Sequence, residues 1–361
     1  MELTTRQTRL IITGIVMGFK LIALPPLLSQ LAENDMWLVL VFSFLLDGAY
    51  LLLFLYFNYK CKGKTMVDYI TQNYGKIISK IVCGIFLVLW IIKSVLLIQE
   101  FYLFLTVALY EDLSIFLYVV MMMLCVMYLG SRRFRDLGRY AELFYYVVMV
   151  GIFLTILTSF NRVDLTNIFP ILYRGTNRVI ISSFKRCLWF GDYSILFVLI
   201  GNIKQEKNFN KKIIGGWFLG VAVSLIVGTI FYMLYAKSGG LHYSAIMDII
   251  QYFPIANSSN RLNSIIVVLW PLLHIWLIGF SGAVCNYSMK SIFSNKSQKN
   301  FCIYYVSALI LAMLIVTQFS YQSLIGLIDS ALNYFIAPVL YGIPLLFLLM
   351  GGIKRLVKKG S

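Results

Sequence analysis

Residues 183–202 read Ser-Phe-Lys-Arg-Cys-Leu-Trp-Phe-Gly-Asp-Tyr-Ser-Ile-Leu-Phe-Val-Leu-Ile-Gly-Asn, a stretch apolar enough to cross a membrane. It nevertheless carries three charged residues, Lys185, Arg186 and Asp192. A charge at the centre of a spanning helix costs about 2.5–3.5 kcal/mol even on mild insertion scales, so it needs a partner, water or a function. Gly191 directly precedes Asp192, and this pairing favours an interrupted helix whose free backbone groups line a cavity. The structural alternative is that the cations snorkel outward and the acid pairs with a neighbouring helix.

The whole chain has the composition of a polytopic membrane protein. Its 361 residues are 60% hydrophobic and only 13% charged, with a mean hydropathy of +0.83. A soluble domain of this size carries roughly 25% charged residues and does not repeat apolar runs of this length. We therefore predict an all-α membrane domain over residues 1–361, with no soluble domain. The apolar segments number about ten and cover residues 10–31, 36–59, 77–109, 114–130, 140–160, 179–202, 213–236, 262–288, 301–317 and 323–350.

The distribution of basic residues predicts the orientation. With the N-terminus inside, 21 of the 31 Lys and Arg residues fall in cytoplasmic loops and ends, and five fall outside. Because cytoplasmic loops of membrane proteins are enriched in Lys and Arg, we expect both termini to be cytoplasmic and the number of spans to be even. The same dispersal over short loops argues against nucleic acid as a partner, although the formal net charge is +16.

The first apolar segment has the same two features as the sixth. It contains Gly14, Gly18 and Lys20, followed by Pro25 and Pro26. Lys20 lies roughly 16 Å beyond Arg9 along a helix, which places it near the middle of the span. The alternative is an ordinary proline kink beside a face of small residues.

Two glycine-interrupted segments with a central charge, five segments apart, are typical of inverted five-helix repeats. The repeats would cover about residues 8–160 and 178–350. Half-helix ends would then bind a small molecule at the bilayer midplane, and we expect the charged groups of Lys20 and Asp192 to lie within about 12 Å of each other across this site. The predicted substrate-binding residues are Gly18, Phe19, Lys20, Leu21, Phe190, Gly191, Asp192 and Tyr193.

Four further charged residues lie within apolar segments and are candidates for charge compensation or a proton relay: Asp47, Lys93, Glu100 and Asp329. Lys93 and Glu100 are seven residues apart, hence about 10 Å apart along one helical face, so they should pair with other helices. For each of the four, structural pairing is the competing interpretation.

No pattern of an enzyme is present, since the sequence lacks a P-loop, a GxSxG elbow and an HExxH motif. The six cysteines form no CxxC pair and the two histidines are far apart, so neither a metal site nor a cofactor is expected.

Short motifs are spread over nearly the whole chain. They are Gly18-Phe-Lys20 with Leu24-Pro25, Asp35-Met-Trp37, Gly63-Lys-Thr65 with Asp68-Tyr69, Glu100-Phe101, Arg139-Tyr-Ala-Glu142, the segment Asp164 to Pro170, and Phe190-Gly-Asp192. Together these motifs resemble those of the spore germination permease family, the integral-membrane B subunits of nutrient germinant receptors, within the amino acid–polyamine–organocation superfamily. Two departures are Lys20, where a second glycine is usual, and the extra charges Lys185 and Arg186.

This resemblance implies a permease-like subunit in the inner membrane of a bacterial spore. It also implies a small nutrient ligand, such as an amino acid, and two partners, a larger membrane subunit and a lipoprotein. A germinant-binding signalling subunit is the first hypothesis. The others are a proton-coupled amino acid transporter working through Asp192 with Lys20 or Glu100, and a structural or channel-like component.

Overall fold

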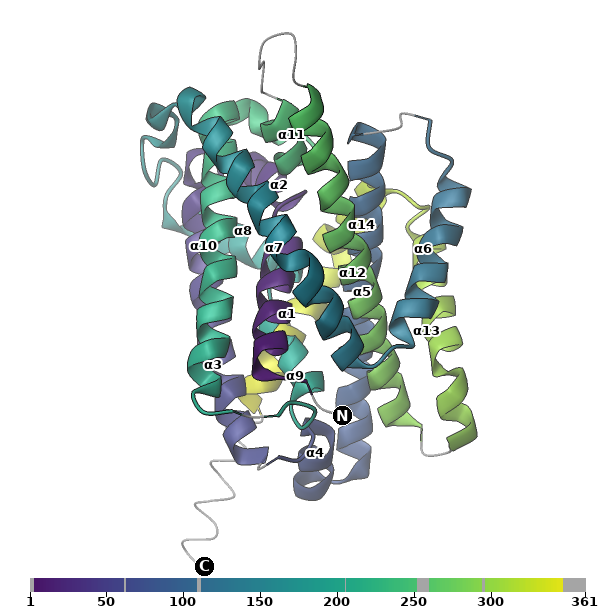
Figure 1. The fold of residues 1–361 in the computed structure, drawn as a ribbon. Coiled ribbons are helices and arrows are strands. Elements are labelled where there is room, and N and C mark those ends of the chain that lie inside the picture. The colour runs from purple at the N-terminus through teal and green to yellow at the C-terminus, as the bar shows by residue number, and fades with distance from the viewer. Residues whose placement is uncertain are drawn as a thin grey trace, which may run out of the picture.

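The computed structural model describes residues 3–61, 63–108, 112–204, 206–251, 260–293 and 296–346. Helices form nearly all of this part of the chain, and its one strand-like feature is an isolated parallel bridge between Leu3 and Ile203. Figure 1 shows long helices running along one axis, with the short helix α1 enclosed among them. The prediction of an all-α architecture is confirmed.

The first apolar segment is broken into two helices, α1 (Thr5–Gly18) and α2 (Leu24–Ala32). A capping box starts α1: Thr4 accepts from the backbone of Gln7, whose side chain accepts from the backbone of Thr4, both at 3.2 Å. Two prolines follow the first residue of α2, where the missing N–H groups cost little. Residues 19–23 between the two helices therefore leave the helical path in the middle of the segment, as the sequence predicts.

Five helices follow before the sixth segment. They are α3 (Met36–Cys61), the short α4 (Met66–Tyr74), α5 (Lys76–Ala108), α6 (Ile115–Gly130) and α7 (Phe134–Ser159). The short helix α4 lies at the same end of the bundle as the N-terminus (Figure 1). We call this the inner end.

The sixth segment is broken more extensively than the first. The helix α8 (Thr176–Lys185) gives way to the 3-10 turns η4 (Cys187–Trp189) and η5 (Asp192–Ile195), and the one-turn helix α9 (Leu196–Leu199) follows. Gly191 stands between the two turns with φ +79°, in the left-handed region that favours glycine. A Cβ there would also approach Leu340 to 2.4 Å. The predicted interruption at Gly191 is present.

The remaining segments are α10 (Phe209–Tyr235), α11 (Ala245–Gln251), α12 (Asn260–Ile292), α13 (Lys296–Val316) and α14 (Tyr321–Leu327). After α14 come the π-helical turn η7 (Ile328–Leu332), α15 (Asn333–Ala337) and a second π-helical turn η8 (Pro338–Gly342). Pro271 lies inside α12 and Pro338 begins η8, whereas residues 347–350 of the tenth segment lie outside the described residues.

Seven helices of the described part are long and apolar enough to cross a membrane by length and composition. The sequence predicts about ten spans. The difference has a physical cause: α6 has only 16 residues, and the first and sixth segments are each divided by their breaks. Because a helix of about 20 residues is needed to cross the hydrocarbon alone, half-helices fail that criterion individually.

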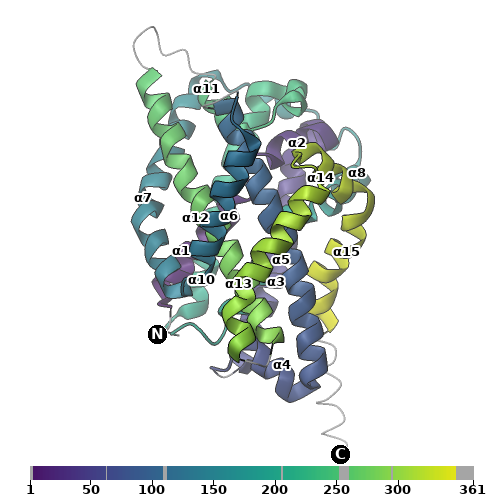
Figure 2. The same ribbon diagram turned by 90° about the vertical axis from the view of Figure 1, so that its right-hand side faces the viewer.

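The core lies around α1 and α12. Helix α1 packs against α10, α7 and α12, while α12 also packs along α5 and α6; α12, α6 and α5 lie next to one another in Figure 2. Gly18, the last residue of α1, lies against Leu277 of α12, where a Cβ would come within 2.0 Å of the leucine side chain. All six cysteines are free thiols.

The inner end is closed by backbone contacts between the N-terminal segment and the residues after α9. Leu3 donates to the carbonyl of Asn202 and accepts from the N–H of Lys204, both at 2.9 Å. Gly201, with φ +87°, lies directly against the backbone of Thr65. The two contacts join the start of α1, the α3–α4 connection and the end of the broken sixth segment.

Candidate functional site

Lys20 and Asp192 form a salt bridge at the point where the two broken segments meet. Their side chains are 0% and 1% exposed. The expected proximity of the two residues is therefore confirmed. The second carboxylate oxygen of Asp192, Oδ1, has no hydrogen-bond partner within the described structure, so this acid keeps an unused acceptor.

A second carboxylate, Asp47 of α3, holds the break of the sixth segment. Its Oδ1 accepts the backbone N–H of Gly191 at 2.7 Å, an amide that the interrupted helix leaves without an intrahelical partner. Its Oδ2 has no partner among the described residues. Two buried carboxylates, those of Asp47 and Asp192, thus lie beside Gly191.

Lys93 of α5 binds the same break at a backbone carbonyl. Its ammonium donates to the carbonyl of Phe190 at 2.6 Å and lies 4.6 Å from the ring centre of Phe19 and 5.6 Å from that of Trp90. Lys20 similarly lies 5.1 Å from the ring centre of Phe190. Aromatic faces attract cations, so these rings compensate part of the cost of burying two ammonium groups.

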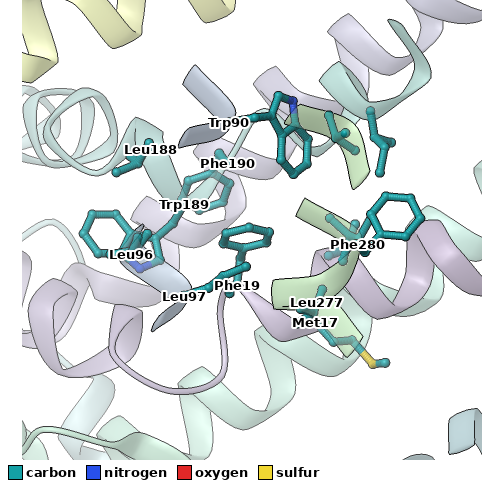
Figure 3. Packing of buried hydrophobic residues seen from close by; sticks show 14 of the residues in the cluster. Met17, Phe19, Trp90, Leu96, Leu97, Leu188, Trp189, Phe190, Leu277 and Phe280 are labelled. Atoms are coloured by element: carbon teal, nitrogen blue, oxygen red, sulfur yellow. The ribbon is translucent and has the colours of Figure 1, made fainter. Parts of the chain in front are cut away.

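Figure 3 shows how the aromatic side chains gather around the break. Phe19 comes from the first break and Trp189 and Phe190 from the sixth segment, while Trp90 and Leu277 approach from α5 and α12. The charged groups are therefore enclosed in an apolar shell. In such a shell electrostatic interactions are stronger than in water.

Glu100 of α5 contacts the sixth segment at Trp189, the residue before Phe190. Its Oε1 accepts the indole N–H of Trp189 at 2.7 Å, and its Oε2 has no partner in the described structure. Lys93 and Glu100 therefore bind different groups of another segment rather than each other, as their spacing predicts. Glu100 reaches the break only through Trp189.

Asp329 does not join this cluster. It pairs with Arg186 through two contacts, 2.5 Å to Oδ1 and 3.3 Å to Oδ2, and its side chain is 39% exposed. This ion pair is the charge compensation that the sequence analysis gives as one role for Asp329, which stands in the π-helical turn η7 and contacts the residue after α8. The sequence spacing of the tenth segment gives no sign of that turn.

Two other predicted residues, Tyr193 and Leu21, contact the protein's own core in this structure. Tyr193 donates from its hydroxyl to the carbonyl of Leu340 at 2.7 Å, and its ring stacks on Tyr50 with 5.3 Å between ring centres. Leu21 is fully buried in the apolar core. Sequence reasoning missed the aromatic residues around the break, which lie in apolar runs without any distinguishing signal: Phe44, Trp90 and Trp189. The charges of Arg186 and Asp329 are visible in the sequence, but their pairing is not.

Comparison with protein families shows which family the chain belongs to. The chain matches the spore germination protein family over residues 2–322. It belongs to that family. The match covers both breaks and every charged residue described above except Asp329.

Similarity to individual proteins supports the assignment of this chain to the spore germination family. It is 23% identical over 216 residues to spore germination protein A2 of Bacillus subtilis (strain 168), a match that covers 57% of each chain. Among solved structures, it resembles a Na+-coupled sialic acid symporter (TM-score 0.58, 12% identity, 93% of this chain and 79% of that one). A manganese transporter of Eremococcus coleocola gives a TM-score of 0.59 at 14% identity, covering 95% and 78%. The chain therefore has a transporter fold.

Proposed function

We propose that this protein is a permease-like subunit of a spore germinant receptor, which binds a small nutrient, an amino acid, between the two broken segments. The observation that carries this proposal is the buried pair of Lys20 and Asp192 at the meeting point of the breaks. An amino acid zwitterion carries the same two charges. The carboxylate of the amino acid would pair with Lys20 and its ammonium would pair with Asp192. The single ion pair between Lys20 and Asp192 would thus be replaced by two ion pairs with the ligand.

The free acceptors of the site support this exchange. Oδ1 of Asp192 and Oδ2 of Asp47 are buried carboxylate oxygens without partners in the described part of the chain. An ammonium group brings three donors, which could satisfy both carboxylates at once. A ligand without donor groups would leave these oxygens unpaired, and that costs free energy in a buried site.

The finer architecture belongs to the same proposal. We infer ten spans in two inverted repeats, about residues 8–160 and 178–350, with both termini cytoplasmic in the spore inner membrane. Support comes from a pocket at the inner end that is lined by Leu3, Asn202, Arg132, Arg133 and Lys290. Basic loops distant in sequence thus gather beside the N-terminus, which agrees with the orientation that the charge distribution predicts.

Signalling requires that the nutrient prefer one of two states. The closed inner end, where Leu3 bonds to Asn202 and Lys204, is one such state. A ligand that bound better when these contacts open or tighten would shift the equilibrium by its differential affinity, and a larger membrane subunit and a lipoprotein would read the change.

Binding and uptake of a labelled amino acid panel by the purified protein in proteoliposomes, with and without a proton gradient, tests this function. We expect saturable binding of at least one amino acid without accumulation. Asp192→Asn should weaken that binding at least tenfold, because the variant loses the carboxylate for the ammonium. Glu206→Gln is the matched control, since it removes an acid from an exposed ion pair with Lys212 and should leave binding unchanged. Unaltered binding in Asp192→Asn would contradict the site.

A proton-coupled transporter is the second candidate, and Glu100 is the observation that favours it. The Oε2 atom of Glu100 is buried without a partner in the described structure, as a proton-accepting group would be. If the protein transports, Glu100→Gln should abolish gradient-driven accumulation while binding persists, because the amide still accepts from Trp189 but cannot titrate. Accumulation at the unmodified rate in Glu100→Gln would exclude Glu100 from proton coupling.

A further inference from the structure

Lys185 is an exposed cation in the sixth segment, and the inference here rests on the proposal above that this segment spans the membrane. Helix α8 begins at Thr176, so Lys185 lies about 14 Å along it, close to half the roughly 30 Å hydrocarbon thickness. Its side chain is exposed, and no ion pair or side-chain hydrogen bond of Lys185 occurs within the described residues. A lone ammonium facing lipid at this depth is costly, so the surface around it needs an explanation.

The surface beside Lys185 is polar as well. Asn333 of α15 donates to the backbone carbonyl of Lys185 at 3.0 Å, and Asp329, 39% exposed, pairs with the adjacent Arg186. Asp329 lies about 12 Å from the start of α14, a depth similar to that of Lys185. In Figure 2, α8, α14 and α15 lie together towards the right-hand edge of the molecule. We call the surface formed by Lys185, Gly326, Asp329, Ser330 and Asn333 the Lys185 face.

The same surface is shaped for close helix contact. Gly326 and Ser330 are four residues apart and both exposed. A Cβ at Gly326 would meet nothing within 4 Å, so this glycine packs against no part of the described chain. Small residues four apart on an outward face let another membrane helix approach closely.

We propose that the Lys185 face docks a membrane-spanning helix of a partner protein that carries an aspartate or glutamate near its middle, with that carboxylate paired to Lys185. Charge complementarity selects this occupant. Pairing of the two charges at the helix interface would remove the cost of exposing the ammonium to lipid and would set the depth at which the two helices meet.

No carboxylate of the described residues pairs with Lys185. Residues 351–361, which follow the tenth segment, contain four Lys and Arg residues and no acid. If a second copy of the chain docked here through the same face, Asp329 would be the acid it offers to Lys185. Both oxygens of Asp329 already contact Arg186. A lipid phosphate could instead receive a snorkelling Lys185, and the experiment below separates that outcome.

The test uses the full chain in nanodiscs and a synthetic Leu/Ala-rich membrane helix with a single central Asp, compared with the same helix carrying Leu. Energy transfer between labelled chain and peptide reports association. We expect the Asp peptide to bind at least tenfold more tightly than the Leu peptide, and Lys185→Met to remove this preference. Lys185→Glu should transfer it to a peptide with a central Lys.

Lys80→Met is the matched control, because Lys80 is an exposed lysine of α5 at the inner end, and it should keep the preference. Equal binding of the Asp and Leu peptides, as snorkelling to lipid predicts, would overturn the proposal, and so would a preference that survives in Lys185→Met. Energy transfer between two labelled copies of the chain without peptide, lost in Lys185→Met, would assign the face to self-association instead. Unchanged elution and thermal midpoint of the variants would show that they fold.

Discussion

Replacing Lys20 by methionine is expected to destabilise the protein by about 3–5 kcal/mol, the usual cost of removing one partner of a buried ion pair. Asp192 would remain as an uncompensated carboxylate whose side chain is 1% exposed, next to the equally buried Asp47. Nutrient binding should be lost with the ammonium. The thermal midpoint in detergent and the binding assay in proteoliposomes measure the two effects.

The double variant Lys20→Met/Asp192→Asn separates structure from function. Both charges are then gone, so we expect most of the lost stability to return, because neutral replacements of buried pairs are often tolerated. Binding should stay lost, since neither charge of a zwitterion has a partner. A double variant whose destabilisation equals the sum of the two single variants would show that the residues are not coupled. A double variant that binds nutrient normally would refute the site.

Gly201→Ala should be the most damaging single-methyl change at the inner end. Gly201 has φ +87°, and a Cβ there would lie 2.6 Å from the backbone N and Cα of Thr65. Left-handed backbone strain and overpacking together should cost about 2–5 kcal/mol. Because a backbone cannot move aside as a side-chain end can, we also expect the contact that joins the α3–α4 connection to the sixth segment to open. Thermal midpoints in detergent measure the loss.

Gly175→Ala is the matched control for this prediction. Gly175 has a similar φ of +79°, but a Cβ there would meet nothing within 4 Å. It should therefore show only the backbone strain, about 1–2 kcal/mol. Equal losses in the two variants would mean that conformation alone, and not the approach to Thr65, demands glycine at Gly201.

Much of the fold follows from the sequence because the bilayer constrains it strongly. Spanning segments must be long, apolar and helical, so apolar runs locate the helices, and the described helices fall on all ten predicted segments. Glycine, proline and a central charge locate the two breaks. The pairing of Lys20 with Asp192 could also be predicted, since two opposite charges in the middle of apolar segments have few other partners.

The sequence alone thus determined the helical membrane architecture, the two broken segments and the ion pair that joins them. Only the tertiary structure decided which groups surround that pair. Asp47 accepts from the amide of Gly191, Lys93 donates to the carbonyl of Phe190, and Glu100 binds the indole of Trp189 instead of the break itself. It also separated Asp329 from the site and left Lys185 on the outside. The physical reason is that burial cost tells which charges need partners, whereas helix rotation and π-helical turns, which leave no trace in composition, select the partners.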